Sequence, residues 1–270
     1  MTSAVRTPAV AGRFYPGDSH VLENDVRSYV TPVQRQLTAL GCVVPHAGYI
    51  YSGEVAGAVF ARMEVPQRCI VLCPNHTGIG YPLAIMSDGA WTTPLGDIEI
   101  DTELAEALKK RFPGLHEDAS AHQREHAVEV QLPFLRITRP DCRFVPIALG
   151  TRRLDILESL GESIADAIAD QEEHVLIIAS SDMNHYESDA VTRVKDQKAI
   201  DCMLARDPRG LFEVVNREEI SMCGFGPTVT MITATNRLGA TVAELVRYAT
   251  SGDISGDREM VVGYAGIVIH

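Results

Sequence analysis

The sequence lacks the features that direct a protein to a membrane or to nucleic acid. No apolar run reaches the roughly 20 residues that a helix needs to span a bilayer. Met1 to Val10 has neither a long apolar segment nor the small-residue cleavage site of a signal peptide. Acidic residues outnumber basic ones by 36 to 24, and the net charge of −12 would repel a phosphate backbone. We therefore expect a cytoplasmic protein that has no nucleic-acid partner and no membrane partner.

The chain also lacks a linker rich in Pro, Gly or Ser, a low-complexity tract and an internal repeat. Its 270 residues are 46% hydrophobic, and a chain of this size buries about three quarters of its surface when it folds. These features predict a single domain over residues 1–270. Because such a core does not need disulfides, we expect the six cysteines to be reduced and mostly buried.

Short β-branched runs alternate with longer amphipathic runs, a pattern typical of an α/β fold. Several short runs are apolar throughout, as in strands covered on both faces. The turn-rich segment SGDISGD predicts an antiparallel hairpin between the last two strands. The prediction is a three-layer α/β/α domain with a mixed, mostly parallel central sheet. Strands are expected at Gly41 to Pro45, Cys69 to Cys73, Leu83 to Met86, Phe144 to Leu149, His174 to Ala179, Ala240 to Thr250 and Met260 to Ile269. Helices are expected at Ser19 to Gln36, Gly53 to Met63, Asp101 to Arg111, Glu125 to Arg136, Leu154 to Asp170, Ser188 to Ala205, Pro208 to Asn216 and Pro227 to Leu238.

Three of the predicted strands run into loops that carry a histidine. The strand GCVVP leads to His46, CIVLC leads to His76, and HVLIIA leads to Asp182 and His185. In open α/β sheets, functional groups gather in the crevice beyond the carboxyl ends of the strands. Neutral imidazole is a common metal ligand, and ligands from distant loops are typical of a site that the fold assembles. His46 and His76 are therefore candidate metal ligands.

Cys223 differs from Cys42, Cys69 and Cys73 because no predicted strand surrounds it. It lies in SMCGFGPTV, where Gly224 and Gly226 allow a tight approach and Pro227 marks a helix start. The N-terminal dipole of that helix would favour a thiolate at Cys223. A thiol of low pKa serves metal ligation and nucleophilic attack equally, and the local motif does not choose between them.

The segment SSDMNHYE places Asp182 and His185 three residues apart at the end of a strand. A carboxylate there could orient an imidazole, and a histidine free of metal could act as a general acid or base near neutral pH. In the alternative interpretation Asp182 caps a helix or a turn, and His185 is an ordinary loop residue.

A second cluster, AHQREHAVEVQLPFL, contains His122, His126 and Glu129. The spacing of the two histidines places both imidazoles on one face of a helix, but the HExxH order of zinc proteases is absent. We interpret them as histidines satisfied by hydrogen bonds at the start of a helix.

Motifs along nearly the whole chain carry a family resemblance: TPAVAGRFYPGD, VPHAGYIYSGEVAGAVF, PNHTGIG, TPLGD, HQREHAVEVQLPFL, SSDMNHYE and CGFGP. In this order they resemble the Memo family, of which the AmmeMemoRadiSam system protein B is a prokaryotic member. The resemblance implies a fold similar to that of the class III extradiol dioxygenases typified by the LigB subunit. Those enzymes hold iron(II) with two histidines and one carboxylate, and a separate histidine acts as acid or base.

The resemblance places the metal ligands on His46, His76 and Cys223, with Asp182 and His185 completing the pocket. It implies His185 as the catalytic acid or base and Asp182 as the carboxylate that orients it or contacts substrate. A cysteine in place of the carboxylate provides a softer donor atom, sulfur instead of oxygen. Such a ligand set suits iron(II) or copper, and also zinc. A thiolate near an oxygen-activating iron is open to oxidation, which argues against unmodified extradiol chemistry.

These features lead us to expect a non-haem, metal-dependent redox enzyme with a small-molecule or peptide ligand in its cleft. A non-catalytic metal-binding, peptide-binding or adaptor protein that retains the cleft is the alternative. A third hypothesis makes Cys223 a nucleophile with His185 as its base. This hypothesis assigns no function to His46 and His76. The family resemblance also implies a radical-SAM protein and an AMMECR1-like protein as partners.

Overall fold

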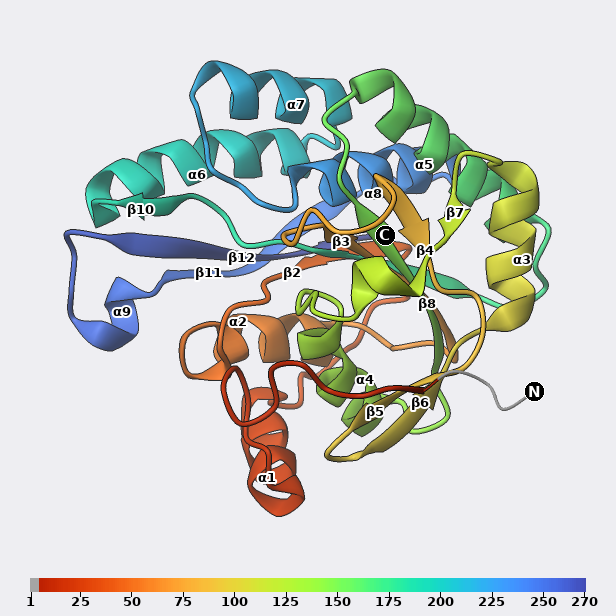
Figure 1. Cartoon of the computed structure of the whole chain (residues 1–270). Helices are drawn as coiled ribbons and strands as arrows, with labels where there is room; N and C mark the ends of the chain where they lie inside the picture. Colours follow the sequence, from red (N-terminus) through yellow and green to blue (C-terminus); the bar gives the residue numbers. More distant parts are fainter. Residues whose placement is uncertain (1–4) are drawn as a thin grey trace.

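The computed structural model describes residues 5–270, which form a large mixed β-sheet with helices on both faces. Figure 1 shows the sheet running between a group of helices that includes α6, α7 and α8 and a second group that includes α1, α2 and α4. The strand order is β10-β12-β2-β9-β3-β8-β4-β7, and β11 pairs with β12. The strands are β2 (Gly41–Val44), β3 (Arg68–Pro74), β4 (Leu83–Ile85), β7 (His116–Glu117), β8 (Arg143–Leu149), β9 (Val175–Ser180), β10 (His185–Glu187), β11 (Ala243–Thr250) and β12 (Val261–Ile269). The helices are α1 (Ser19–Tyr29), α2 (Tyr49–Arg62), α3 (Thr102–Arg111), α4 (Leu132–Thr138), α5 (Leu154–Ala169), α6 (Asp189–Leu204), α7 (Pro208–Arg217), α8 (Phe225–Arg237) and α9 (Gly252–Ser255).

The centre of the sheet is parallel and its flanks are mixed. β9 pairs in parallel with both β2 and β3, and β3 pairs in parallel with β8. On one flank β12 lies antiparallel to β2, and on the other β4 lies antiparallel to β8. The three-layer α/β/α prediction is therefore confirmed, including the antiparallel hairpin of β11 and β12. A smaller sheet of β1 (Val5–Arg6), β5 (Ala90–Thr93) and β6 (Gly96–Glu99) was not predicted from the sequence.

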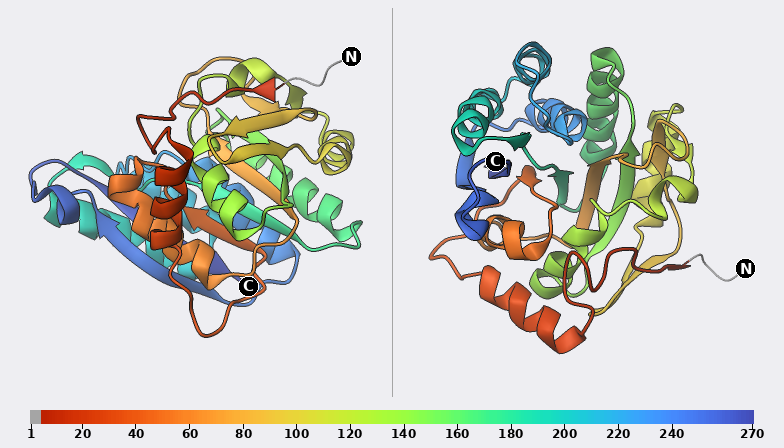
Figure 2. Two further views of the ribbon diagram at one scale, coloured as in Figure 1. Left: turned by 90° about the horizontal axis from the view of Figure 1, so that it is seen from below. Right: turned by 60° about the vertical axis from the view of Figure 1, so that its left-hand side comes forward.

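The central strands are apolar along their whole length because both of their faces are covered. Val43 of β2 packs into the hydrophobic core beneath α5 and α8. Its neighbours Cys42 and Val44 point the other way, into the core beneath α1, α2 and α4. In the right-hand view of Figure 2 the red and orange helices α1 and α2 lie on one side, and the blue helices α7 and α8 and the green helix α5 lie on the other.

Several helix boundaries differ from the prediction for identifiable reasons. α1 ends at Tyr29 because the following Thr-Pro sequence disfavours further helix. The helix predicted for residues 125–136 is confirmed only from Leu132 onward, where α4 begins, and was wrong for residues 125–131, which include a 3₁₀ turn at Glu129–Gln131. The Glu125 carboxylate accepts the backbone N–H of Ala127 at 3.0 Å and thereby competes with helix formation there.

No helix within residues 5–270 has the length and apolar character needed to cross a membrane.

Candidate metal centre

The strands β2, β3 and β9 end at the same edge of the sheet, and the loops that follow them line one cavity. His46 follows β2, His76 follows β3 and Asp182 follows β9, whereas Cys223 comes from the loop before α8. The cavity has a volume of about 560 Å³. The structure therefore brings together all five residues proposed from the sequence. The lining residues are Phe14, His46, Ala47, Gly48, His76, His126, Asp182, His185, Tyr186, Ser221, Cys223 and Val262.

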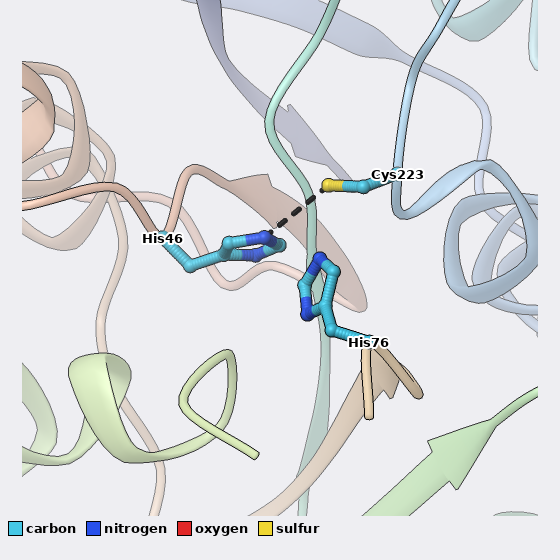
Figure 3. Close-up of side chains that lie close together, drawn as sticks. All are labelled: His46, His76 and Cys223. Atoms are coloured by element: carbon cyan, nitrogen blue, oxygen red, sulfur yellow. Dashed lines mark hydrogen bonds between the residues drawn. The ribbon is translucent and has the colours of Figure 1, made fainter. Parts of the chain in front are cut away.

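Three candidate ligand atoms point toward one another in this cavity (Figure 3). The donor atoms of His46, His76 and Cys223 all lie within 4.8 Å of one another. First-row metal ions bind imidazole nitrogen and thiolate sulfur at about 2.0 to 2.3 Å, so ligand atoms around one ion are separated by less than about twice that length. The spacing of the three side chains fits one such ion.

Hydrogen bonds fix the orientation of the His46 ring. The Ser180 hydroxyl donates its proton to the carbonyl oxygen of Ala127 at 2.6 Å and accepts from Nε2 of Gln131 at 2.9 Å. The same oxygen lies 3.0 Å from Nδ1 of His46. Because the hydroxyl proton is already donated to Ala127, this oxygen accepts a hydrogen bond from Nδ1–H of His46. The Nε2 lone pair of His46 then faces Sγ of Cys223, which is 3.2 Å away. Burial and the neighbouring imidazoles hold the pKa of His46 well below its ordinary value, which favours the neutral ring that metals bind.

A buried carboxylate orients the second imidazole. Oε1 of Glu125 lies 2.9 Å from Nδ1 of His76, and Oε2 accepts the backbone N–H of His76 at 2.7 Å. Burial opposes a charge on the ring, but the hydrogen bond and charge of Glu125 outweigh burial and raise the pKa of His76. The arrangement leaves Nε2 of His76 for a ligand, as in the carboxylate–histidine pairs of metal proteins.

Glu125 itself is a poor candidate for a metal ligand, although its oxygens lie within 4.8 Å of donor atoms of His76 and His126. Besides His76, its Oε1 accepts the backbone N–H groups of His126 at 2.9 Å and Ala127 at 3.0 Å. These bonds occupy the carboxylate, and its pKa is lowered despite burial, chiefly by the hydrogen bond and charge of His76 and then by the bond from Ala127. Glu125 was not predicted from the sequence, because no local spacing links it to a histidine 49 positions earlier.

The environment of Cys223 contradicts one sequence-based expectation. α8 begins at Phe225, two residues before the expected start at Pro227. Burial, reinforced by the nearby Asp182 carboxylate, raises the pKa of the Cys223 thiol. The expected low pKa was therefore wrong, because desolvation outweighs the favourable field of the helix N-terminus. The imidazole in contact with the thiol is His46, so the structure also gives no direct support to His185 as the base of a cysteine nucleophile.

Asp182 stabilises the loop after β2. Its Oδ1 accepts the backbone N–H of His46 at 2.8 Å, and its Oδ2 lies 4.0 Å from Nε2 of the same residue. Burial raises the pKa of Asp182 to about 7, against the opposing effect of these backbone hydrogen bonds. The carboxylate lines the cavity, but its hydrogen bonds go to the loop of His46 and not to His185.

Ser221, rather than Asp182, orients His185. The backbone N–H of His185 donates to Oγ of Ser221 at 2.7 Å, and its Nδ1 lies 2.9 Å from the Ser221 carbonyl oxygen. A carbonyl oxygen only accepts, so Nδ1 carries the proton and Nε2 of the neutral ring holds the lone pair. Burial lowers the pKa of His185, which keeps that lone pair available near neutral pH.

His126 also belongs to the cavity, which the sequence analysis did not predict. Its ring stacks on that of His76 with centroids 4.8 Å apart and meets Phe14 edge-on at 4.7 Å. His122, by contrast, is fully buried against Trp91, with ring centroids 5.7 Å apart. The two histidines therefore do not share a helical face. Within the described chain, neither ring nitrogen of His122 has a hydrogen-bond partner of ordinary geometry, so the expectation of a satisfied helix-start histidine was wrong for this residue.

Glu129 ties the N-terminal segment to the domain. Its carboxylate accepts the backbone N–H groups of Ala9 at 2.8 Å and Val10 at 3.0 Å, and the hydroxyl of Tyr15 at 2.7 Å. It also forms a buried ion pair of 2.8 Å with Arg6. The segment held in this way carries Phe14 to the cavity wall.

Comparisons with known proteins agree on the family and the fold. A family model described as "Memo-like protein" matches residues 6–268. A MEMO1 family protein of Methanopyrus kandleri is 43% identical, over 97% of this chain and 98% of the relative. Another, from Methanosarcina mazei, is 40% identical over 98% of this chain and 99% of the relative. The crystal structure of an uncharacterized protein from Escherichia coli K12 is similar in fold, with a TM-score of 0.54, 11% identity and coverage of 84% of this chain and 98% of that one.

The buried His122 predicts a specific acid sensitivity. Burial, reinforced by Arg6, lowers the pKa of His122 to about 4 from an ordinary value of 6.5. Between these two pH values the unfolded chain binds a proton that the folded chain does not, so this residue lowers the free energy of unfolding as pH falls. Between pH 6.5 and pH 4, the free energy of unfolding should fall by about 3 kcal/mol less in His122→Leu than in the wild type. Urea denaturation at each pH measures this difference.

Asp182 and Asp196, whose pKa values burial raises to about 7, act in the opposite direction. The measured quantity is therefore the difference in slope between variant and wild type. His20→Leu, at an exposed position, is the matched control variant. A wild-type slope in His122→Leu would contradict the assignment.

Proposed function

Because this chain belongs to the Memo-like protein family, as its motifs indicated, we propose that it binds a metal ion in the cavity and performs metal-dependent redox chemistry there. The observation that carries this proposal is the convergence of His46, His76 and Cys223 to within 4.8 Å, with each imidazole oriented by a buried hydrogen-bond acceptor. Hydrogen bonds that fix the orientation of an imidazole in this way are typical of metal ligands.

The donor set also narrows the choice of metal. Two imidazoles and one thiolate suit iron(II), copper or zinc better than magnesium or manganese, which prefer oxygen ligands. The Cys223 thiol, whose pKa burial raises, would give up its proton on binding a cation, which couples metal affinity to pH. Iron or copper would supply one-electron and oxygen chemistry, so we favour these two metals.

The remaining cavity residues have roles that do not depend on the choice of metal. His185 presents Nε2 as a proton acceptor, held in one tautomer by the Ser221 carbonyl oxygen. Asp182 holds the loop of His46 in place and offers a carboxylate to a ligand in the cavity. His126 and Phe14 form an aromatic wall beside His76. In this proposal, an acid or base and an aromatic wall for the substrate lie beside the metal ligands.

A metal-binding or adaptor protein without catalytic activity would need the three ligands but not His185. The hydrogen bond that fixes the tautomer of His185 therefore favours an enzyme over a purely binding protein.

Replacement of the thiol tests the ligand set. We expect Cys223→Ser to weaken copper(I) and zinc binding by at least about tenfold and manganese binding by less, because hydroxyl oxygen is a harder donor than thiolate sulfur. Anaerobic calorimetric competition measures these affinities. Cys202→Ser, a half-buried cysteine on α6, is the matched control and should bind all three metals as the wild type does. An equal effect on every metal, or none, would show that the thiol is not a ligand.

Replacement of His185 separates catalysis from binding. We expect His185→Gln to keep its metal affinity and to lower oxygen uptake with a catechol panel by about 10²- to 10⁴-fold, the usual contribution of a general acid or base. His20→Gln, at an exposed site on α1, should leave uptake unchanged. Metal-loaded wild type that consumes no oxygen with any substrate would support the binding-protein alternative.

A further inference from the structure

Tyr186 adopts a backbone conformation that an aromatic residue rarely takes. Its φ is +61°, in the left-handed region. Within residues 5–270 the other non-glycine residues with positive φ are Arg206 and Glu219, which follow the C-terminal ends of α6 and α7, where this conformation is common. Tyr186 lies in the short strand β10, so no helix end accounts for its conformation.

The conformation belongs to a β-bulge that changes where side chains point. His185 pairs with Val262, and Glu187 pairs with Val261. The paired residues are two positions apart in β10 but adjacent in β12, so Tyr186 is the extra residue of the bulge. Successive side chains of a regular strand point to opposite faces. Here His185 and Tyr186 line the same cavity, and their rings meet with centroids 5.6 Å apart. The bulge therefore brings Tyr186 to the side of the sheet where His185 acts.

Bonds on either side of Tyr186 hold the bulge in place. Nδ2 of Asn184 donates to Oε2 of Glu187 at 2.7 Å, which spans the bulge directly. Oδ1 of Asn184 accepts the backbone N–H of Ser221 at 3.0 Å, which joins β10 to the loop that carries Cys223. Strained backbone that is fixed so firmly by its surroundings is characteristic of functional sites.

The ring of Tyr186 has no packing role that would justify this strain. It is 69% exposed, although it lines the mouth of the cavity. The described lining residues include no lysine or arginine, and their basic side chains are all histidines. An exposed aromatic face beside a cavity without lysine or arginine suits a flat, uncharged group of a ligand.

We propose that Tyr186 is a specificity residue, whose ring forms one side of the cavity mouth and packs against a flat, uncharged part of the ligand. This inference rests on the proposed function only in requiring that a ligand reach the metal centre.

The strain can be tested on the metal-free protein by thermal unfolding. Glycine takes a positive φ without steric cost, whereas alanine does not. We expect Tyr186→Gly to melt at a higher temperature than Tyr186→Ala, although glycine normally destabilises a strand relative to alanine. The opposite order would contradict the bulge conformation and overturn the proposal.

Ligand recognition is tested on zinc-loaded protein with two metal-chelating probes, 4-nitrocatechol, which is flat and aromatic, and acetohydroxamate, which is not aromatic. We expect Tyr186→Gly to weaken 4-nitrocatechol binding by about tenfold and Tyr186→Phe to preserve it, because the ring provides the contact. Acetohydroxamate affinity should be equal in all three proteins. An unchanged affinity for 4-nitrocatechol in Tyr186→Gly, or an equal loss for both probes, would overturn the proposal.

Zinc affinity, measured beforehand for each protein, distinguishes failure of the proposed function from failure of the role proposed for Tyr186. Wild type that binds no zinc or other thiophilic metal would contradict the proposed function. Normal zinc affinity with no discrimination between the probes would contradict the role of Tyr186 alone.

Discussion

The parallel pairing of β2, β9 and β3 is the constraint on which the site depends. Val44 lies opposite Ser180, and Leu72 lies opposite Ala179, so the three strands end almost level. The loops after them deliver two imidazoles and a carboxylate to one edge of the sheet. Ser180, the last residue of β9, reaches Nδ1 of His46 in this register. A slip of one residue would turn its hydroxyl to the other face and leave the ring without its acceptor.

Burial gives the cavity its chemical character. The pKa of His46 is lowered, the pKa of Cys223 is raised, and the pKa of Asp182 is raised to about 7. All three shifts have the same physical cause, since a low-dielectric pocket disfavours charge of either sign. A bound cation would reverse the balance for the thiol and the carboxylate while using the neutral imidazole as it is. His76 is the exception in this cavity, because the Glu125 carboxylate raises its pKa despite burial.

The sequence predicted the large-scale fold and the histidines that meet in the cavity, because apolar strands and strand-end histidines leave local patterns. The orienting residues could not be predicted. Glu125 orients a histidine 49 positions away in the sequence, and Ser221 orients one 36 positions away. No spacing rule connects residues that meet only after folding. The environment of Cys223 was misjudged for the same reason, since a helix N-terminus is visible in a sequence but the depth of burial is not. Tyr186 depends on a bulge whose register is set by β12.

X-ray absorption spectroscopy of the full chain, loaded anaerobically with one equivalent of iron(II), copper(I) or zinc, identifies the atoms bound to the metal. We expect one metal ion per chain, with one sulfur scatterer at about 2.3 Å and two imidazole nitrogens at about 2.0 to 2.1 Å. Ligand atoms that are only oxygen or nitrogen, or the absence of bound metal for all three ions, would contradict a metal centre at His46, His76 and Cys223.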